Sequence, residues 1–289
     1  MIHAGGRFVA EDEAVVSLLD RGYLHGDGVF ATMRGYAGVC FRSEVHLEAL
    51  ERSAARFDLA LPLPRGRLRA LADEAAVRTG ASDAYVRVTL TRGATDGAAT
   101  LSILARPMDV PSEEDYAHGV SSVIVAPRRI PPACLDGTIK TTSYAVQILA
   151  RREAASRGAS EGIQLALDGT LACGTMSNLF VVTGDDLLTP PLETGCRAGV
   201  IRGALLELAP RLGLAPIERS LDRRALAECD EAFFASTRVE CLPIAEVDGV
   251  RVGRRETPSF SRTHGLREAL RDLVRDERPR PASPRAAGP

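Results

Sequence analysis

Apolar and polar residues alternate along this chain with two different periods. In residues 84–91, apolar side chains occupy every second position and mostly polar ones lie between them, which predicts a half-buried strand. Residues 44–57 carry apolar side chains at steps of three and four, which predicts an amphipathic helix, and a second helix is expected over 66–79. A further strand is predicted over 29–36. The first part of the chain therefore mixes strands and helices.

The rest of the chain repeats this mixture. Residues 107–114 hold two prolines and no periodicity, so they are the best candidate for a linker between two domains. Beyond them, short apolar runs predict strands and longer amphipathic stretches predict helices. The strands are expected over 120–126, 163–167, 179–183 and 232–235, and the helices over 142–156, 199–212 and 263–276.

The length of 289 residues allows one large domain or two modest ones, and with the linker candidate at 107–114 we expect an α/β fold in two domains. A smaller N-terminal α+β domain is expected over residues 1–110 and a larger C-terminal domain over 111–275. Residues 276–289 are rich in proline, arginine and alanine and have nothing to bury, so they are expected to form a disordered tail.

Composition excludes several classes of function. Hydrophobic residues make up 45% and charged residues 26%, as in an ordinary globular protein. The 36 basic and 38 acidic side chains give a net charge of −2, which supplies no electrostatic attraction for nucleic acid or anionic lipid. The N-terminus has no signal-like pattern and no stretch of about 18 apolar residues occurs, so we expect a cytoplasmic protein.

Cysteine and histidine spacing gives no sign of a metal site. The six cysteines are scattered without any Cys-x-x-Cys pair, and the five histidines show no ligand spacing. We therefore expect reduced thiols and no metal.

The basic residues are distributed in an unusual way. Lys140 is the only lysine, so the other 35 of the 36 basic side chains are arginines. Arginine keeps its proton near neutral pH, whereas a lysine with a lowered pKa can attack a carbonyl. Schiff-base chemistry would therefore require a lysine at that one position. An arginine-favouring composition that happened to spare one lysine explains the count equally well.

The order of short motifs along the chain carries a family resemblance. The motifs are Asp20–Gly22, Gly26–Phe30, His46-Leu47, Thr91–Gly93, Ile139–Tyr144, Ser177–Phe180, Thr189–Pro191, Gly199–Arg202 and Ser236-Thr237. Their order resembles that of the class IV, or fold-type IV, pyridoxal-phosphate (PLP) enzymes, which include branched-chain and D-amino-acid aminotransferases and 4-amino-4-deoxychorismate lyase. The match covers roughly residues 1–250 in unbroken order.

This resemblance implies a fold and a cofactor site. The larger domain would have a barrel-like core, and PLP would lie in a cleft between the domains. Lys140 would be the Schiff-base lysine and then the general base at the substrate α-carbon. Tyr144 would lie near the phenolic oxygen of the cofactor. The backbone amides of Val200 and Ile201, at the start of a helix, and the hydroxyl of Thr237 would hold its phosphate.

The resemblance also implies a substrate pocket and an assembly. Phe30 and Arg34 fall where related enzymes line the pocket, and the planar guanidinium of Arg34 could pair with a substrate carboxylate. The substrates would be an amino acid and a 2-oxo acid. A homodimer is implied by the family alone.

Several positions depart from the family pattern. The arginine that usually binds the phosphate is replaced by Ala49. Arg52 or Arg238 could supply that charge instead, although a surface role explains either arginine at least as well. The glutamate that usually protonates the pyridine nitrogen is replaced by Cys173, whose neutral thiol cannot stabilise a pyridinium. Ala31 and Ile201 replace a usual glutamate and threonine.

Three functions follow from the resemblance and its departures. The first is a PLP-dependent aminotransferase that works through a Schiff base on Lys140. The second is a lyase like aminodeoxychorismate lyase, which eliminates pyruvate with the same cofactor. The third is a relative that has lost PLP and acts without a cofactor or as a binding protein.

Overall fold

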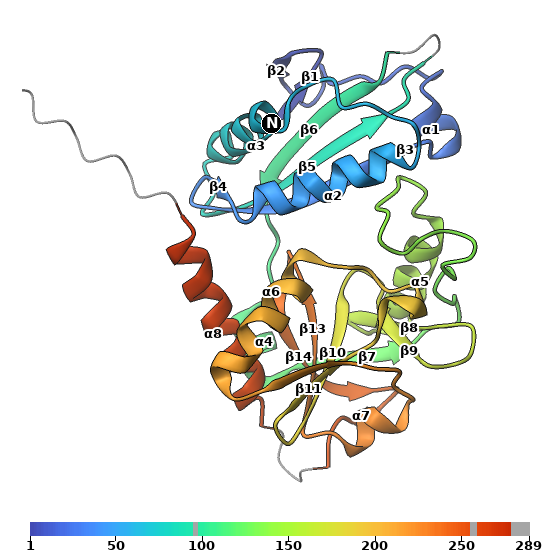
Figure 1. Cartoon of the computed structure of the whole chain (residues 1–289), viewed down its shortest axis with the longest axis vertical. Helices are drawn as coiled ribbons and strands as arrows, with labels where there is room; N and C mark the ends of the chain where they lie inside the picture. Colours follow the sequence, from blue (N-terminus) through green and yellow to red (C-terminus); the bar gives the residue numbers. More distant parts are fainter. Residues whose placement is uncertain (95–97, 255–258, 279–289) are drawn as a thin grey trace, which may run out of the picture.

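The computed structural model describes residues 1–94, 98–254 and 259–278. Its N-terminal half is an antiparallel sheet of six strands in the order β2-β1-β6-β5-β3-β4, with helices on one face (Figure 1). Its elements are β1 (Ile2–Ala4), β2 (Arg7–Val9), α1 (Arg21–His25), β3 (Gly28–Tyr36), β4 (Val39–Cys40), α2 (Ser43–Ala55), α3 (Arg65–Arg78), β5 (Asp83–Thr91) and β6 (Thr100–Pro107).

The two faces of strand β3 lie in different environments. Val29, Ala31 and Met33 point into a core that strands β3, β5 and β6 form with helices α2 and α3. Successive side chains of a strand point to opposite faces, so Phe30 and Arg34 face away from this core. The outer face of β3 is therefore available to contact the rest of the chain.

The C-terminal half is built on a second sheet, in the order β12-β11-β10-β13-β14-β7-β8-β9, with β15 added beside β14. Strand β9 ends this order yet also contacts β10, so the sheet curls into a partly closed barrel. Its elements are α4 (Glu113–His118), β7 (Val120–Ile124), α5 (Ala145–Ser156), β8 (Glu161–Leu165), β9 (Leu171–Gly174), β10 (Asn178–Thr183), β11 (Asp186–Thr189), α6 (Val200–Leu208), β12 (Ala215–Glu218), α7 (Arg224–Glu228), β13 (Glu231–Ser236), β14 (Glu240–Val247), β15 (Val250–Arg251) and α8 (Ser261–Asp276), with 3-10 turns at Leu192–Thr194 and Ala209–Leu212.

The expected α/β fold with a curled larger sheet is confirmed, and two expected helices need correction. The helix expected over 142–156 begins only at Ala145. The helix expected over 199–212 ends at Leu208 and continues as a 3-10 turn, because Pro210 has no N–H for a helical hydrogen bond. Of the tail expected over 276–289, residues 279–289 lie outside the described residues.

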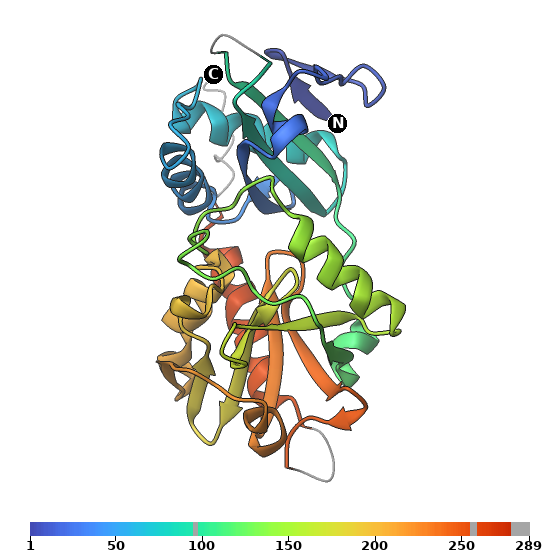
Figure 2. The same ribbon diagram turned by 90° about the vertical axis from the view of Figure 1, so that its right-hand side faces the viewer.

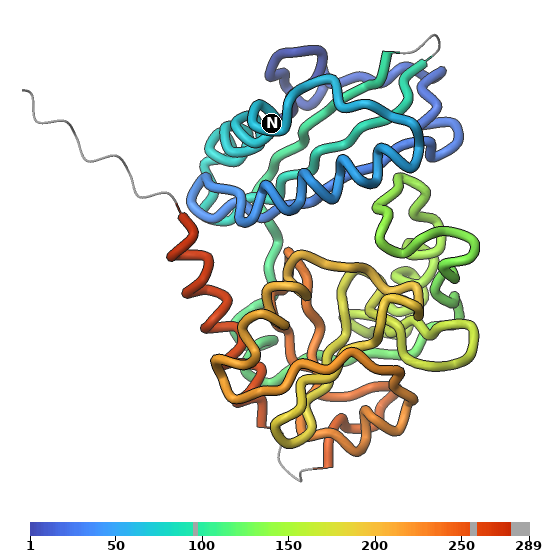
Figure 3. Tube along the Cα trace, in the orientation of Figure 1, coloured from blue at the N-terminus to red at the C-terminus, as the bar shows by residue number. Residues whose placement is uncertain are grey.

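The two halves are stacked along the long axis of the molecule, with the chain segment that contains Lys140 between them (Figures 2 and 3). The backbone of this segment pairs with the edge of strand β3 at its N-terminal end. The Phe30 amide donates to the Lys140 carbonyl (2.9 Å) and the Thr142 amide donates to the Gly28 carbonyl (2.9 Å). These bonds replace the first turn of the expected helix, and they fix Lys140 at the boundary between the halves.

Candidate functional site

The Lys140 side chain lies in an aromatic and polar corner at this boundary. Its amine nitrogen Nζ is 3.4 Å from the Tyr144 hydroxyl, 4.4 Å from the centre of the Phe30 ring and 5.4 Å from that of the Tyr144 ring. The two rings meet edge to face with centroids 5.4 Å apart. Phe30 comes from β3 and Tyr144 from the turn before α5, so both halves build this corner. The structure thus brings together three of the residues selected from the sequence.

Arg197 extends toward Lys140 from the loop that precedes helix α6. Its guanidinium donates to the carbonyls of Ile139 (2.8 Å) and Thr138 (3.2 Å), the two residues before Lys140. The Asn178 side-chain amide holds the Arg197 carbonyl at 2.7 Å. Burial lowers the pKa of this guanidinium, and no carboxylate in the described part of the chain forms an ion pair with it.

Two more arginines without carboxylate partners among the described residues are close to Lys140. The guanidinium carbon of Arg87, on β5, lies 3.5 Å from the centre of the Phe30 ring. Arg129 is buried and donates to the Gly195 carbonyl (2.6 Å). Together with Arg197, they make this corner strongly positive.

Burial and these charges control the protonation of the Lys140 amine. Burial lowers its pKa well below the usual range, and the positive charges of Arg197, Arg87 and Arg129 lower it further. A neutral amine is a nucleophile and a proton acceptor, whereas an ammonium ion is neither. The corner therefore offers a reactive amine beside groups that attract anions.

The N-terminus of helix α6 adds polar groups to the same region. Gly199 is its N-cap, and a side chain there would collide with Asn178. The free amides of the first turn, which include those of Val200 and Ile201, and the helix dipole favour an anion. The Ile201 side chain is buried in the core beneath the helix. Thr237 is half-buried in the turn between β13 and β14.

Two neutral side chains face each other on strands β8 and β9. Cys173 is buried beside Ala172 and Cys196, and burial raises the pKa of its thiol to about 11. Gln164 lies opposite Cys173 in the strand register and donates its side-chain amide to the Pro127 carbonyl (3.2 Å). Neither side chain carries a charge at neutral pH.

Three arginines considered from the sequence are paired with protein carboxylates. Arg34 is buried and pairs with Asp83 (2.7 Å) and Glu240 (3.2 Å), so its charge is already balanced inside the protein. Arg52 and Arg238, the two candidates for the charge missing at position 49, are engaged in surface ion pairs. Each is solvent-exposed and paired with an acidic side chain, Glu48 at 3.0 Å and Asp109 at 2.8 Å respectively.

Sequence reasoning missed the three arginines that surround Lys140. Arg197 stands two residues before the Gly199 motif, and this closeness is a signal that could have identified it. Arg87 is a polar residue of the strand predicted over 84–91. No signal in the sequence sets Arg129 apart from the many other arginines.

These residues fit PLP in most respects. The reactive Lys140 amine suits its aldehyde, the Tyr144 hydroxyl is within reach of that amine, and the unpaired arginines and the α6 N-terminus suit its phosphate. Cys173 fits poorly, because the resemblance places the ring nitrogen there. Among the described residues, no group of three or more potential metal ligands occurs and no helix is long and apolar enough to cross a membrane.

The fold and the family comparison define a class IV aminotransferase. The family model "Amino-transferase class IV" matches residues 28–247, and the chain belongs to this family.

Relatives with different named activities share this fold. A Methanocaldococcus jannaschii protein, provisionally named a branched-chain-amino-acid aminotransferase, is 31% identical over 94% of this chain and 96% of its own. The aminodeoxychorismate lyase of Bacillus subtilis is 27% identical over 96% of this chain and 97% of its own. A solved Mycobacterium tuberculosis structure, described as a hypothetical aminotransferase in its PLP-bound form, is 26% identical. It has a TM-score of 0.84 and covers 96% of this chain and 100% of its own.

Proposed function

We propose that this protein is a PLP-dependent aminotransferase that moves an amino group between an amino acid and a 2-oxo acid, with Lys140 holding the cofactor covalently. The observation that carries this proposal is the only lysine of the chain, placed beside Tyr144 with a lowered pKa and surrounded by unpaired arginines. When bound, PLP supplies an electron sink for the charge that develops at the substrate α-carbon.

Lys140 has two roles in this proposal. When PLP is bound, the neutral amine of Lys140 would hold it through its aldehyde, and once an amino acid has displaced this amine it would accept the proton from the substrate α-carbon. The Tyr144 hydroxyl, 3.4 Å from Nζ, keeps the amine oriented. Phe30 packs against both groups and limits the access of water to the amine.

Different arginines bind the two anionic groups, the cofactor phosphate and the substrate carboxylate. Arg197 and the amides of Val200 and Ile201 hold the cofactor phosphate, because Arg197 precedes the helix that presents those amides. The Thr237 hydroxyl stays a prediction for the same phosphate. Arg87 binds the substrate carboxylate, since its guanidinium stacks on Phe30 and has no carboxylate partner among the described residues. It thus takes the role that the sequence suggested for Arg34.

The neutral thiol of Cys173 sets the expected character of the enzyme. Without a carboxylate at that place, the ring nitrogen of the cofactor gains little stabilisation as a cation. Removal of the α-proton by Lys140 is therefore expected to be slow. This feature distinguishes the proposed enzyme from relatives that carry glutamate at this position.

Pyruvate elimination is the second candidate function. The Bacillus subtilis aminodeoxychorismate lyase matches nearly the whole chain, which favours this alternative. The two reactions differ in their products. With 4-amino-4-deoxychorismate as substrate, release of pyruvate without a 2-oxo acid acceptor supports the lyase, whereas a strict need for an acceptor with amino acid substrates supports the aminotransferase.

We also propose a homodimer, from a surface that is unusually apolar. Large apolar side chains are exposed in the segment from residue 15 to helix α1 and on α5, and both lie on the same side of the molecule (Figures 1 and 2). Exposed apolar patches of this kind mark protein interfaces. The residues are Val15, Val16, Leu18, Leu19, Tyr23, Leu24, Ile148 and Leu149.

Covalent trapping tests the proposed function. The purified protein is incubated with PLP, reduced with borohydride and digested, and we expect mass mapping to place one pyridoxyl group on Lys140. Lys140→Arg keeps the positive charge but lacks a reactive amine, so it serves as the matched control and should remain unlabelled. Because the pKa of Lys140 is lowered, the rate of labelling should level off well below pH of about 10.4, the usual pKa of a lysine. A wild-type chain without PLP absorbance or adduct would favour the cofactor-free alternative.

A further inference from the structure

Glu240 is a buried carboxylate at the junction of the two halves. It is the first residue of β14, and its side chain is wholly buried. Its backbone has a φ of 52°, a left-handed conformation that is uncommon for a residue with a side chain. Such strain persists where the surrounding contacts hold the residue firmly, and it often marks functional positions.

Contacts from the N-terminal half hold one oxygen of this carboxylate. The Tyr36 hydroxyl donates to Oε1 (3.1 Å) and the Arg34 guanidinium pairs with it (3.2 Å). Arg34 also donates to Asp83 (2.8 Å), which keeps its planar group in one orientation. Both donors to Glu240 come from the outer face of strand β3.

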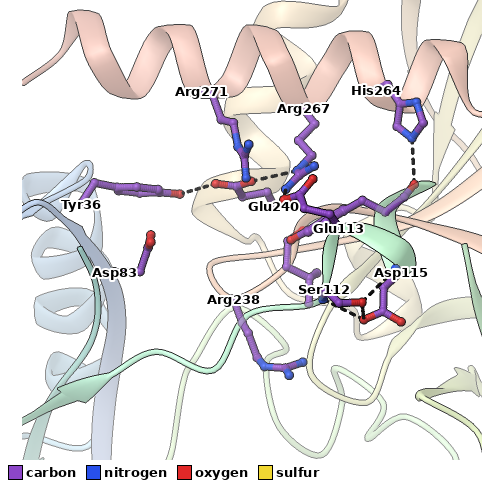
Figure 4. A network of polar contacts seen from close by, with 12 residues as sticks. Tyr36, Asp83, Ser112, Glu113, Asp115, Arg238, Glu240, His264, Arg267 and Arg271 are labelled. Carbon is purple, nitrogen blue, oxygen red and sulfur yellow. Dashed lines mark hydrogen bonds and ion pairs between the residues drawn. The ribbon is translucent and has the colours of Figure 1, made fainter. Parts of the chain in front are cut away.

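Contacts from the C-terminal helix hold the other oxygen. Arg271 and Arg267 of α8 pair with Oε2 at 2.9 Å and 3.2 Å (Figure 4). Arg34 reaches further into this half, where it donates to the carbonyl of Arg238 (3.4 Å) in the turn that also holds Thr237. One buried carboxylate therefore connects β3, the β13–β14 turn and α8. We call Glu240 with Arg34, Tyr36, Arg267 and Arg271 the Glu240 clamp.

The Glu240 clamp and the Lys140 corner share strand β3. Phe30, Arg34 and Tyr36 are separated by even numbers of residues, so they share one face of this strand. Phe30 contacts Lys140 and Tyr144, while Arg34 and Tyr36 contact Glu240. The four-residue step from Phe30 to Arg34 spans about 13 Å of extended strand. A shift of β3 at Arg34 is therefore transmitted along the strand to Phe30.

We propose that Glu240 is a positioning residue for the Lys140 site: by holding Arg34 and Tyr36, it sets where β3 presses Phe30 against Lys140. This inference rests on the proposed function for its link to PLP. It assigns Arg34 the task of joining the two halves, and it explains why the charge of this arginine is fully balanced inside the protein. The same clamp fixes the turn that carries Thr237, through the Arg238 carbonyl.

The test replaces the carboxylate by an amide of the same shape, Glu240→Gln. The first measurement is the pKa of the Lys140 amine in the apo-protein, from the pH dependence of its acylation followed by mass spectrometry. Lys140 is the only side-chain amine, so the N-terminal amine serves as an internal reference. We expect the pKa of Lys140 to rise toward its usual value in the variant, because a displaced Phe30 leaves the amine more hydrated.

The second measurement is PLP affinity, from absorbance titration well below the melting temperature. Substitutions that act on a binding site through a network of packed side chains change its affinity by factors of roughly 2 to 30. We therefore expect the PLP affinity of Glu240→Gln to fall by a factor in this range. Tyr36→Phe removes a single hydrogen bond and should shift both measurements in the same direction by less. It keeps the test informative if Glu240→Gln does not fold.

A matched control and two contrasting outcomes complete the experiment. Glu74→Gln breaks a surface ion pair with Arg78 within helix α3 and should change neither measurement. If folded Glu240→Gln and Tyr36→Phe melt at lower temperature but keep the wild-type pKa of Lys140 and the wild-type PLP affinity, the clamp is only structural and the inference is wrong. A shifted pKa in a chain that never binds PLP would support the clamp and refute the proposed function instead.

Discussion

Replacing Arg197 by alanine tests which residue supplies the charge that Ala49 lacks. A guanidinium has five N–H donors, and Arg197 uses two of them on the carbonyls of Ile139 and Thr138. The other donors and the charge have no carboxylate partner among the described residues. We therefore expect Arg197→Ala to weaken PLP binding by much more than a change in local packing would.

The magnitude follows from the kind of contact that is lost. A hydrogen bond to a charged group contributes about 1.5 to 3 kcal/mol, which corresponds to a roughly tenfold to hundredfold change in the dissociation constant. Loss of the two bonds to carbonyls also loosens the segment before Lys140. That second effect does not depend on phosphate, so it can be separated by the choice of ligand.

Titration with PLP and with pyridoxal, which has no phosphate, makes this separation. We expect Arg197→Ala to weaken PLP binding strongly and pyridoxal binding only slightly, and Arg197→Lys to restore part of the difference. Arg52→Ala and Arg238→Ala are matched controls, because each removes an exposed arginine paired with an acidic side chain. Equal losses for the two ligands would refute a phosphate contact and leave Arg197 only a role in holding the backbone.

Two further substitutions test the ring-nitrogen site and the assembly. Cys173→Glu should speed the first half-reaction in stopped-flow absorbance, because a carboxylate at this position would stabilise a protonated ring nitrogen. Lost thermal stability without faster kinetics would show that Cys173 is only a small buried hydrophobe. Leu18→Glu should convert the proposed homodimer to monomers in light scattering, because Leu18 is 72% exposed in the apolar segment. Val77→Glu, at a 64% exposed position on α3, is the control and should leave the mass unchanged. An unchanged mass for Leu18→Glu would contradict the proposed interface.

Elements with a regular alternation of apolar and polar residues could be predicted from the sequence, and elements without it could not. The strand expected over 84–91 is β5 (Asp83–Thr91), and its alternating burial is the pattern from which it was predicted. Strand β14 was missed because Pro243 and several buried residues in succession erase the alternation. The sequence pattern predicts a helix from Thr142, but residues 142–144 belong to the loop that precedes α5. Its pairing with β3 comes from a strand more than a hundred residues earlier in the chain.

The sequence by itself determined the family. The ordered motifs depend only on which residues occur and in what order, and the family match confirms this resemblance. The single lysine is also visible in the sequence, and its role as the Schiff-base residue stays a prediction. Only the tertiary structure decided which arginines have acidic partners. Arg34, Arg52 and Arg238 have acidic partners, whereas Arg87, Arg129 and Arg197 have none among the described residues. In a chain with 35 arginines, this difference depends on which carboxylates lie within reach after folding, and spacing along the sequence does not record it.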